Sequence, residues 1–206
     1  MKGASHQFAG VRSISILACL VIATAAHAQG DPEPAADGDE RRFELSILGG
    51  VGGFTGGLAS VTDFGPVWGL QLDAEIVRPL YLELSYQGFV FPITDTRLIQ
   101  QSVWGHGAIA LAKISVPYTK SISPFVATGL SATLADPTDG TQDLFRPDVL
   151  IEIPAAIGLE FRTDFIEAGV RLTWRAMLRQ ALVDESQYGP LKGGTLVGNL
   201  AIGIRL

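Results

Sequence analysis

In residues 149–161, VLIEIPAAIGLEF, and residues 166–175, IEAGVRLTWR, apolar side chains alternate with polar or small ones. Ile151 and its second neighbours share one face, while Glu152 and its second neighbours share the other. A period of two residues is typical of a β-strand that has different surroundings on its two faces. The tight link Arg162–Asp164 joins the two segments, so together they predict an antiparallel hairpin.

The same alternation recurs from Phe43 to the end of the chain, and helical periodicity is hard to find. Most of the alternating segments approach the length at which a tilted strand crosses a bilayer, about 9–11 residues. Strands of ordinary globular proteins are shorter, at about 5–6 residues. The eight predicted strands are residues 43–54, 68–77, 80–87, 103–116, 125–134, 149–161, 166–175 and 196–206.

The predicted connections alternate between short and long. Outer-membrane barrels have short periplasmic turns and long extracellular loops. The fold predicted for residues 43–206 is therefore all-β: an eight-stranded, antiparallel, up-and-down transmembrane β-barrel with both termini on the periplasmic side. The short links are residues 78–79, 117–124 and 162–164, and the long ones, rich in Gly, Asp, Thr and Pro, are 55–66, 92–98, 135–148 and 179–194.

The inward face of this predicted barrel is charged, whereas its outward face is apolar. A soluble barrel for an apolar ligand has the opposite polarity, so the inversion indicates lipid on the outside. Because an isolated buried charge is costly and eight strands enclose little more than side chains, we expect a packed salt-bridge network that plugs the lumen. An ion path is the alternative. The expected network comprises Glu44, Asp73, Glu75, Glu83, Lys113, Glu152, Glu160, Glu167, Arg171, Arg175 and Arg205.

The aromatic residues predict two belts at the membrane interfaces, where amphipathic rings prefer the headgroup level. Trp68 and Trp104 open strands that follow long loops, and Trp174 lies late in a strand that approaches one. All three are therefore expected at the outer interface. The opposite belt is expected to contain Phe43, Tyr81, Tyr118, Phe125, Phe161 and Phe165.

The tight turn after Phe161 also predicts how its two strands pair. If Thr163 and Asp164 form the centre of the turn, paired residues have numbers that add up to 327. Glu152 then lies opposite Arg175 on the inner face, which predicts a direct salt bridge between them.

The same register places Glu160 opposite Glu167, a like-charge pair that is unfavourable by itself. A cation has to relieve it. Arg205 on the last strand is the expected cation, because that strand neighbours the seventh and closes against Glu44, and Arg171 is the second candidate.

The first 28 residues have the three parts of a secretory signal peptide. Lys2 and Arg12 are basic, an apolar stretch begins at Ile14, and Ala26-His27-Ala28 provides a small-residue cleavage site. The apolar stretch is shorter than the about 20 residues of a spanning helix. We therefore expect export and cleavage after Ala28.

An acidic leader is expected to follow the signal peptide. Residues 29–42, QGDPEPAADGDERR, lack an apolar pattern, and their composition predicts disorder. The single cysteine, Cys19, weakly resembles a lipoprotein site, but the apolar run continues past it, so lipidation is the lesser alternative. Without Lys2 and Arg12, 13 of the 15 basic residues remain against 21 acidic ones, a formal charge of −8. This charge argues against nucleic acid as a partner.

Two short motifs resemble those of the small outer-membrane β-barrel family, which includes the opacity-type proteins and the membrane domain of outer membrane protein A. Residues 124–130, PFVATGL, look like that family's strand opening of proline, aromatic, valine, small residue and glycine. Residues 156–161, AIGLEF, look like its glycine-containing strand that ends in an acid and an aromatic. The general resemblance covers residues 43–206 and implies the same porin-like fold in a Gram-negative cell envelope. The chain departs from the family at Leu206, where such proteins usually end on an aromatic that the assembly machinery recognises.

No catalytic, metal or cofactor site is expected. The glycine-rich residues 49–57 lack the lysine and the helix of a phosphate-binding loop. His106 is the only histidine after residue 28. A lipid A deacylase motif requires a serine two residues after the histidine, and that position is Ala108; no G-x-S-x-G motif is present either. His106 shares its face with Trp104, so it is expected at the outer interface.

The sequence therefore favours a non-enzymatic outer-membrane protein with a structural or surface-interaction role through its extracellular loops. A lipid-modifying enzyme of the esterase or acyltransferase kind and a soluble periplasmic barrel for a small ligand are the alternatives. The expected partners are outer-membrane lipid, lipopolysaccharide and the barrel assembly machinery, and the expected state is a monomer.

Overall fold

The computed structural model describes residues 43–94, 101–138, 145–163, 165–179, 182 and 193–206. The predicted signal peptide, its cleavage site and the acidic leader lie outside these residues, as do parts of the long loops. No helix in the described part of the chain has the length and apolar character needed to cross a membrane.

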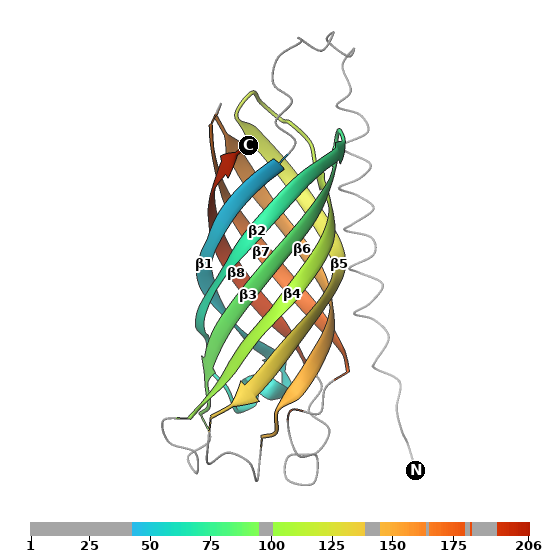
Figure 1. Ribbon diagram of the computed structural model, residues 1–206. Coiled ribbons are helices and arrows are strands. Elements are labelled where there is room, and N and C mark those ends of the chain that lie inside the picture. Colours follow the sequence, from blue (N-terminus) through green and yellow to red (C-terminus); the bar gives the residue numbers. More distant parts are fainter. Residues whose placement is uncertain (1–42, 95–100, 139–144, 164, 180–181, 183–192) are drawn as a thin grey trace, which may run out of the picture. The chain divides into compact units, whose positions relative to one another are not determined.

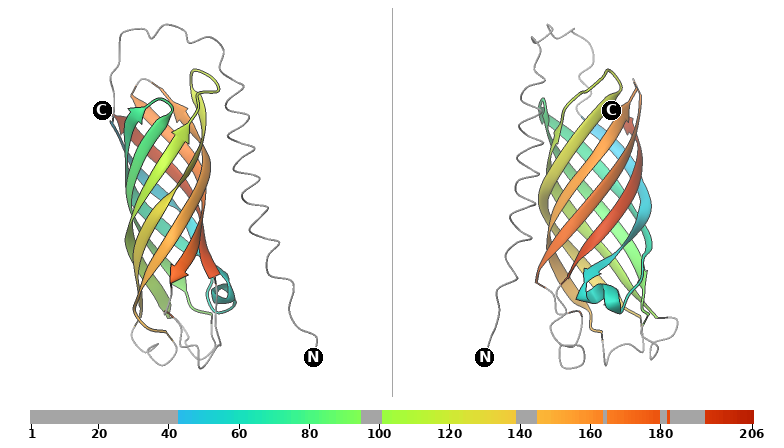
Figure 2. Two further views of the ribbon diagram at one scale, coloured as in Figure 1. Left: turned by 90° about the vertical axis from the view of Figure 1, so that its right-hand side faces the viewer. Right: turned by 180° about the vertical axis from the view of Figure 1, so that it is seen from behind.

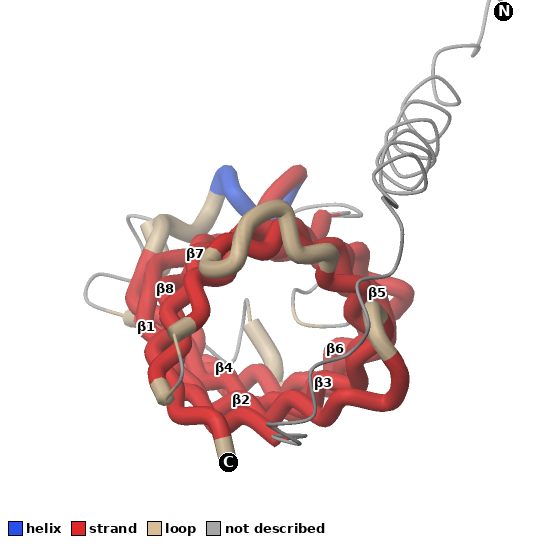
Figure 3. The backbone as a smooth tube through the Cα atoms, turned by 90° about the horizontal axis from the view of Figure 1, so that it is seen from above, coloured by secondary structure: helices blue, strands red, loops and turns tan. Residues whose placement is uncertain are grey.

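Eight antiparallel strands form a closed barrel, in which each strand pairs with its neighbours in sequence and β8 closes against β1 (Figures 1 and 3). This confirms the fold class and the strand count predicted from the sequence. A 3-10 helix, η1 (Gly57–Ser60), follows the first strand. The strands are β1 (Phe43–Gly56), β2 (Gly65–Val77), β3 (Leu80–Pro92), β4 (Ser102–Ser115), β5 (Ile122–Pro137), β6 (Asp148–Arg162), β7 (Ile166–Arg179) and β8 (Gly193–Arg205).

The two ends of the barrel differ. At one, here called the short-turn end, β2 joins β3, β4 joins β5 and β6 joins β7, and this end also holds the start of β1 and the end of β8. The opposite, long-loop end carries η1 and the four longer connections (Figures 1 and 2). The alternation of short and long links in the sequence is therefore an alternation between two ends of one barrel.

The strand residues alternate between an apolar outer wall and an enclosed lumen. Ile47 and Ile202 are 62% and 61% exposed on the wall, whereas Glu83 and Lys113 are fully buried inside. The strands have 13 to 16 residues, more than the about 9–11 that cross a bilayer at a tilt. The wall is thus tall enough to span a membrane, with its apolar residues facing outward.

Two glycines make room for aromatic rings of the neighbouring strand. A Cβ atom on Gly158 would lie 2.5 Å from the Phe125 ring inside the lumen. On the outer wall, a Cβ atom on Gly88 would lie 2.7 Å from the indole of Trp68. In both cases the ring lies over the backbone of the glycine, and a larger side chain there would push the ring away. Each glycine therefore sets the position of its aromatic neighbour.

Candidate functional site

The lumen changes from polar to apolar along its length. On β3 the inward residues are Tyr81, Glu83, Ser85 and Gln87 from the short-turn end, and then Phe89 and Phe91 toward the long-loop end. The predicted charged interior is therefore correct for one part of the lumen and wrong for the other. The apolar part was not expected from the sequence, although the period of two on β3 extends through both phenylalanines.

Lys113 of β4 is the centre of the charged part. Its ammonium nitrogen lies 2.9 Å from Oδ1 of Asp73 on β2 and 2.7 Å from Oε1 of Glu160 on β6. The hydroxyl of Ser115 donates to Oε2 of Glu160 at 2.9 Å. A fully buried ammonium is therefore held by two carboxylates from strands on either side of β4, as a buried charge requires.

Arg162 is the cation that separates the two glutamates Glu160 and Glu167. Its Nη2 lies 2.5 Å from Oε2 of Glu160, and its Nε donates to Oε2 of Glu167 at 2.7 Å. Arg162 was expected in the turn and Arg205 in this role, and that prediction was wrong. Among the described residues, Arg205 donates a 3.4 Å hydrogen bond to the backbone carbonyl of Thr163 and binds no carboxylate. The alternation of β6 places Arg162 on the same face as Glu160, and this signal could have identified it.

Arg171 of β7 binds the fully buried Glu83 across the lumen. Its Nη1 donates to Oε1 at 2.6 Å and its Nη2 to Oε2, a two-bond arrangement that suits the planar guanidinium group. The guanidinium carbon also lies 5.0 Å from the centre of the Phe125 ring. Arg171 therefore has its own carboxylate and does not relieve the Glu160 and Glu167 pair.

The expected ion pair between Glu152 and Arg175 is present, with Nη1 of Arg175 3.7 Å from Oε2 of Glu152. Arg175 also donates through Nη2 to Oε1 of Gln87. Three hydroxyl groups donate to the Glu152 carboxylate at 2.9 to 3.3 Å, those of Ser131, Thr133 and Thr195.

The predicted pairing of β6 with β7 is nevertheless wrong by two residues. Phe161 lies opposite Ala168, and Arg162, not Glu160, lies opposite Glu167, so the residue numbers add up to 329 over most of the hairpin. Because side chains alternate with a period of two, a shift by two residues keeps every side chain on its predicted face. Glu152 and Arg175 therefore meet diagonally, although Glu152 lies opposite Met177.

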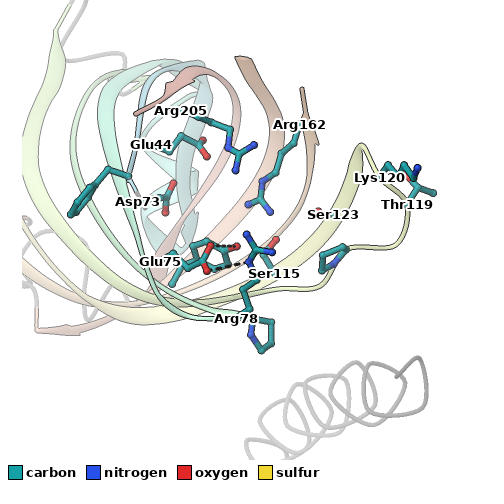
Figure 4. A pocket seen from close by; sticks show the side chains of 14 residues that line it. Glu44, Asp73, Glu75, Arg78, Ser115, Thr119, Lys120, Ser123, Arg162 and Arg205 are labelled. Carbon is teal, nitrogen blue, oxygen red and sulfur yellow. Dashed lines mark hydrogen bonds and ion pairs between the residues drawn. The ribbon is translucent and has the colours of Figure 1, made fainter. Parts of the chain in front are cut away.

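A polar cavity of about 210 Å³ opens at the short-turn end of the lumen. Figure 4 shows Glu44, Asp73, Arg162 and Arg205 around it. Glu44 and Arg205 are direct neighbours across β1 and β8, and the Glu44 carboxylate accepts a 3.3 Å hydrogen bond from Ser46. Glu75 is bound at the rim by Arg78, whose side chain is 72% exposed. The predicted charges thus extend from this open mouth into the closed interior.

An apolar plug fills the lumen at the long-loop end. Phe89 and Phe91 are stacked with ring centres 4.2 Å apart, and Phe54 packs edge-on against both. Residues outside the strands complete the plug. Its buried members are Phe54, Leu58, Val61, Val67, Phe89, Phe91, Ile93, Val103, Ala135, Phe145, Leu150, Leu182 and Val197.

The three tryptophans point outward. Of the six residues expected in the opposite aromatic belt, four are exposed and two point into the lumen. Trp68, Trp104 and Trp174 are exposed on the wall, with Trp68 and Trp104 in edge-to-face contact at 6.5 Å. Phe43, Tyr118, Phe161 and Phe165 are also exposed. The prediction was wrong for Phe125 and Tyr81, whose rings point into the lumen, each 5.5 Å from the Lys113 ammonium.

His106 lies on the outer wall, as expected. Its neighbours across the strands are Gly88 and Leu134, and its ring lies 6.4 Å from that of Tyr86. Within the described part of the chain, no group of three or more His, Cys, Asp or Glu residues is arranged to hold a metal ion.

Comparison with solved structures identifies the fold. Neisserial surface protein A has a TM-score of 0.59 and 9% identity, covering 82% of this chain and 100% of that one. Ail, the attachment invasion locus protein of Yersinia pestis, has a TM-score of 0.51 and 12% identity, covering 80% and 99%. The outer membrane enzyme PagL matches more weakly, with a TM-score of 0.42 and 15% identity over 79% and 99%. No protein-family model and no curated protein sequence matches the chain. The chain has the fold of the small outer-membrane β-barrels that its motifs resemble.

Proposed function

We propose that this chain is a non-enzymatic outer-membrane protein whose lumen is closed and whose long loops contact partners at the cell surface. The observation that carries the proposal is the inverted polarity of the barrel. Its exposed wall is apolar, while charged side chains such as Lys113 with Asp73 and Arg171 with Glu83 are buried inside as pairs. A wall of this kind is stable in contact with the hydrocarbon of a membrane. In a soluble protein it would expose an apolar band to water, which is unfavourable.

The two-part lumen supports a closed barrel rather than an ion path. Ions that enter the mouth at the short-turn end meet fixed ion pairs, then a stack of phenylalanine rings. A dry apolar constriction is an effective barrier to ions, because an ion has to lose its hydration shell there.

The surroundings of His106 support a role without catalysis. Hydrolysis of an ester by a histidine needs a nucleophile within hydrogen-bonding reach and an acid that orients the ring. In the described part of the chain, the direct cross-strand partners of His106 are Gly88 and Leu134, and neither of them is a nucleophile. The soluble ligand-binding alternative is disfavoured because the charged half of the lumen offers an apolar ligand no surface.

The proposed partners follow from the proposed location. The wall would contact outer-membrane lipid, the long loops would contact lipopolysaccharide or surface partners, and the barrel assembly machinery would insert the chain. We propose a monomer, since β8 pairs with β1 and the eight described strands leave no open edge.

Cell fractionation with a gel assay tests the location. The protein should sediment with the outer membrane, require detergent for extraction and migrate faster on gels before heating than after it. Recovery in the soluble fluid released by osmotic shock would refute the proposal. The orientation is tested by cysteine labelling: Asp63→Cys at the long-loop end should react with an impermeant maleimide on intact cells, and Thr119→Cys at the short-turn end only after lysis.

A further inference from the structure

Three carboxyl groups lie side by side on neighbouring strands near the short-turn end of the lumen. Glu44 on β1 is the direct cross-strand partner of Asp73 on β2, and Asp73 is the partner of Glu83 on β3. None of the three is more than 8% exposed. Like charges directly opposite one another destabilise a sheet, so each group needs a positive charge or has to be neutral.

Two members of this row have cations from across the lumen. Lys113 binds Asp73, and Arg171 binds Glu83. These two carboxylates are therefore ionised at no great cost, although both are buried.

Glu44 differs from the other two members of the row. Its direct partner on β8 is Arg205, which donates to the carbonyl of Thr163. Among the described residues, no cation forms an ion pair with Glu44, and its carboxyl group accepts a hydrogen bond from Ser46. A buried carboxyl group in such surroundings is more stable with a proton than without one.

The carboxyl group of Glu44 meets that of Glu167 on β7, and the two side chains are hydrogen-bonded. They reach each other across β8, where Gly203 is the direct partner of Glu167. A Cβ atom on Gly203 would collide with the hydroxyl of Ser46, so this inward position stays free of a side chain. Since a carboxylate is only an acceptor, a hydrogen bond between two carboxyl groups has to contain a proton.

Both carboxyl groups line a small internal space of about 20 Å³, which has room for one water molecule. Gln71 also lines it, and its Oε1 is buried without a donor among the described residues. Glu44 lines the polar cavity at the mouth as well, where Figure 4 shows it beside Asp73 and Arg205. The pair can therefore exchange a proton with the solution at the short-turn end.

The charges around the pair favour one proton. The described charged groups that face Glu44 and Glu167 are Asp73 of β2, Lys113 of β4, Glu160 and Arg162 of β6, Arg171 of β7 and Arg205 of β8. Among them, Arg162 is the cation bound to the pair, through Glu167. One bound cation balances one negative charge, which is the charge of the pair when it carries one proton.

We propose that Glu44 and Glu167 share one proton, and that this proton forms a pH-sensitive connection between β1 and β7 across β8. When the proton leaves for the solution as the pH rises, two carboxylates remain in one small space beside Asp73 and repel each other. The end of the barrel where β8 closes against β1 then loses stability. The inference goes beyond the proposed function and does not depend on the membrane location.

Infrared spectroscopy tests for the proton directly, because a protonated carboxyl group has a carbonyl stretch that a carboxylate lacks. The folded, unaltered protein in maltoside micelles should show this band at neutral pH and lose it at alkaline pH. Glu44→Gln should lack the band at neutral pH. Glu83→Gln is the matched control: it removes a carboxyl group of the same row that Arg171 keeps ionised, so the band should remain.

The pH dependence of urea unfolding tests the connection. An unfolded glutamate loses its proton near pH 4.3, whereas the folded pair keeps one above that pH, so stability is present at low pH and lost as the pH rises. One retained proton increases the equilibrium constant for unfolding about tenfold per pH unit until the folded pair also loses it. Glu44→Gln should remove this contribution to the slope, because the amide remains a neutral donor to Glu167. Glu83→Gln should retain it.

Three results would overturn the inference. The first is a folded, unaltered protein that shows no protonated carboxyl band at neutral pH. The second is a stability that increases with sodium concentration at that pH, which would identify a metal cation as the occupant beside Glu44. The third is a slope that persists in Glu44→Gln or disappears in Glu83→Gln, which would assign the proton to another group. The membrane location is unaffected by all three, since fractionation tests it separately.

Discussion

The arginines of the lumen differ in how many carboxylates each one holds. Arg171 binds one glutamate through two hydrogen bonds, and Arg162 bridges two glutamates from neighbouring strands. Arg205, at the open mouth, has one long hydrogen bond to a backbone carbonyl. A residue's contribution to stability therefore depends on the partners that its removal would leave unpaired inside the barrel.

Arg162→Gln should destabilise the barrel considerably more than Arg205→Gln. The first change removes two short charged hydrogen bonds, each of which contributes about 1.5–3 kcal/mol, and leaves Glu160 and Glu167 without a cation between them. The second removes one weak bond and should cost no more than about 1 kcal/mol. Urea unfolding followed by gel migration measures both. A larger effect of Arg205→Gln would restore the role that the sequence analysis gave to it.

Arg175→Ala should cost about 3–5 kcal/mol, because it leaves the Glu152 carboxylate buried without a counterion. Glu152→Gln in the same chain should recover part of this loss, since the amide carries no charge. Arg78→Ala is the matched control: it also removes an arginine from an ion pair, but at an exposed site, where the expected cost is roughly 0–1 kcal/mol. Equal losses for the two arginine variants would contradict the burial argument.

At the scale of elements, the turn between β6 and β7 sets the pairing of the strands. The amide and hydroxyl groups of Thr163 both donate to the carbonyl of Ile166 at 2.9 Å, and the Ile166 amide donates to the Thr163 hydroxyl at 3.1 Å. The turn therefore closes between Thr163 and Ile166, one residue beyond the closure assumed from the sequence. A turn centre that moves by one residue changes the sum of the paired residue numbers by two.

Cysteine pairs distinguish the two registers directly. Phe161→Cys/Ala168→Cys should form a disulfide readily, because these residues are direct partners. Phe161→Cys/Ile166→Cys, the pair that the sequence-based register would join, should oxidise poorly, since diagonal Cβ atoms are about 7 Å apart and a disulfide needs about 3.5–4.5 Å. Mass spectrometry after thiol alkylation measures the fraction oxidised. Preferential oxidation of the second pair would show that the turn closes earlier.

At the scale of the whole molecule, the lumen has two parts in series. The charge network lies toward the short-turn end, and the apolar plug lies at the long-loop end, where Leu58, Phe145 and Leu182 add side chains from outside the strands. The loops are joined to one another as well, since the Arg146 amide donates to the Leu182 carbonyl at 2.8 Å. Any partner that rearranges the long loops therefore acts on the plug and not on the salt bridges.

The plug, more than the charge network, should keep the barrel from conducting ions. The unaltered protein is expected to show no steady current in planar bilayers. Phe89→Ala/Phe91→Ala removes the stacked rings and should produce single-channel currents, because water and ions can then enter the constriction. If the double variant folds poorly, the single variant Phe91→Ala replaces it and should give smaller currents. The difference in gel migration before and after heating identifies the folded protein.

Arg171→Gln and Phe161→Ser are the controls for this experiment. Arg171→Gln removes the charge that pairs with Glu83 but leaves the plug intact, and Phe161→Ser removes a ring on the outer wall. The barrels of both variants should therefore remain closed to ions. Conduction through Arg171→Gln, or its absence in both plug variants, would mean that the salt bridges close the lumen.

The sequence by itself determined the strands, their order and the face of most side chains. These properties depend on a period of two along a single segment, and a strand such as β6 carries that period whatever its partner is. For the same reason the inward position of Glu152 and Arg175 survived an error of two residues in their pairing, since a slip by an even number does not exchange the faces.

Only the tertiary structure decided which charges meet and what closes the lumen. Lys113 meets Asp73 and Glu160, which are 40 and 47 residues away, because the closed barrel brings β2, β4 and β6 around one interior. The plug joins Phe54, Phe89 and Phe91 to residues of loops that carry no alternation at all. Contacts across a lumen depend on barrel closure, strand register and loop path together, and none of these is a property of a single segment.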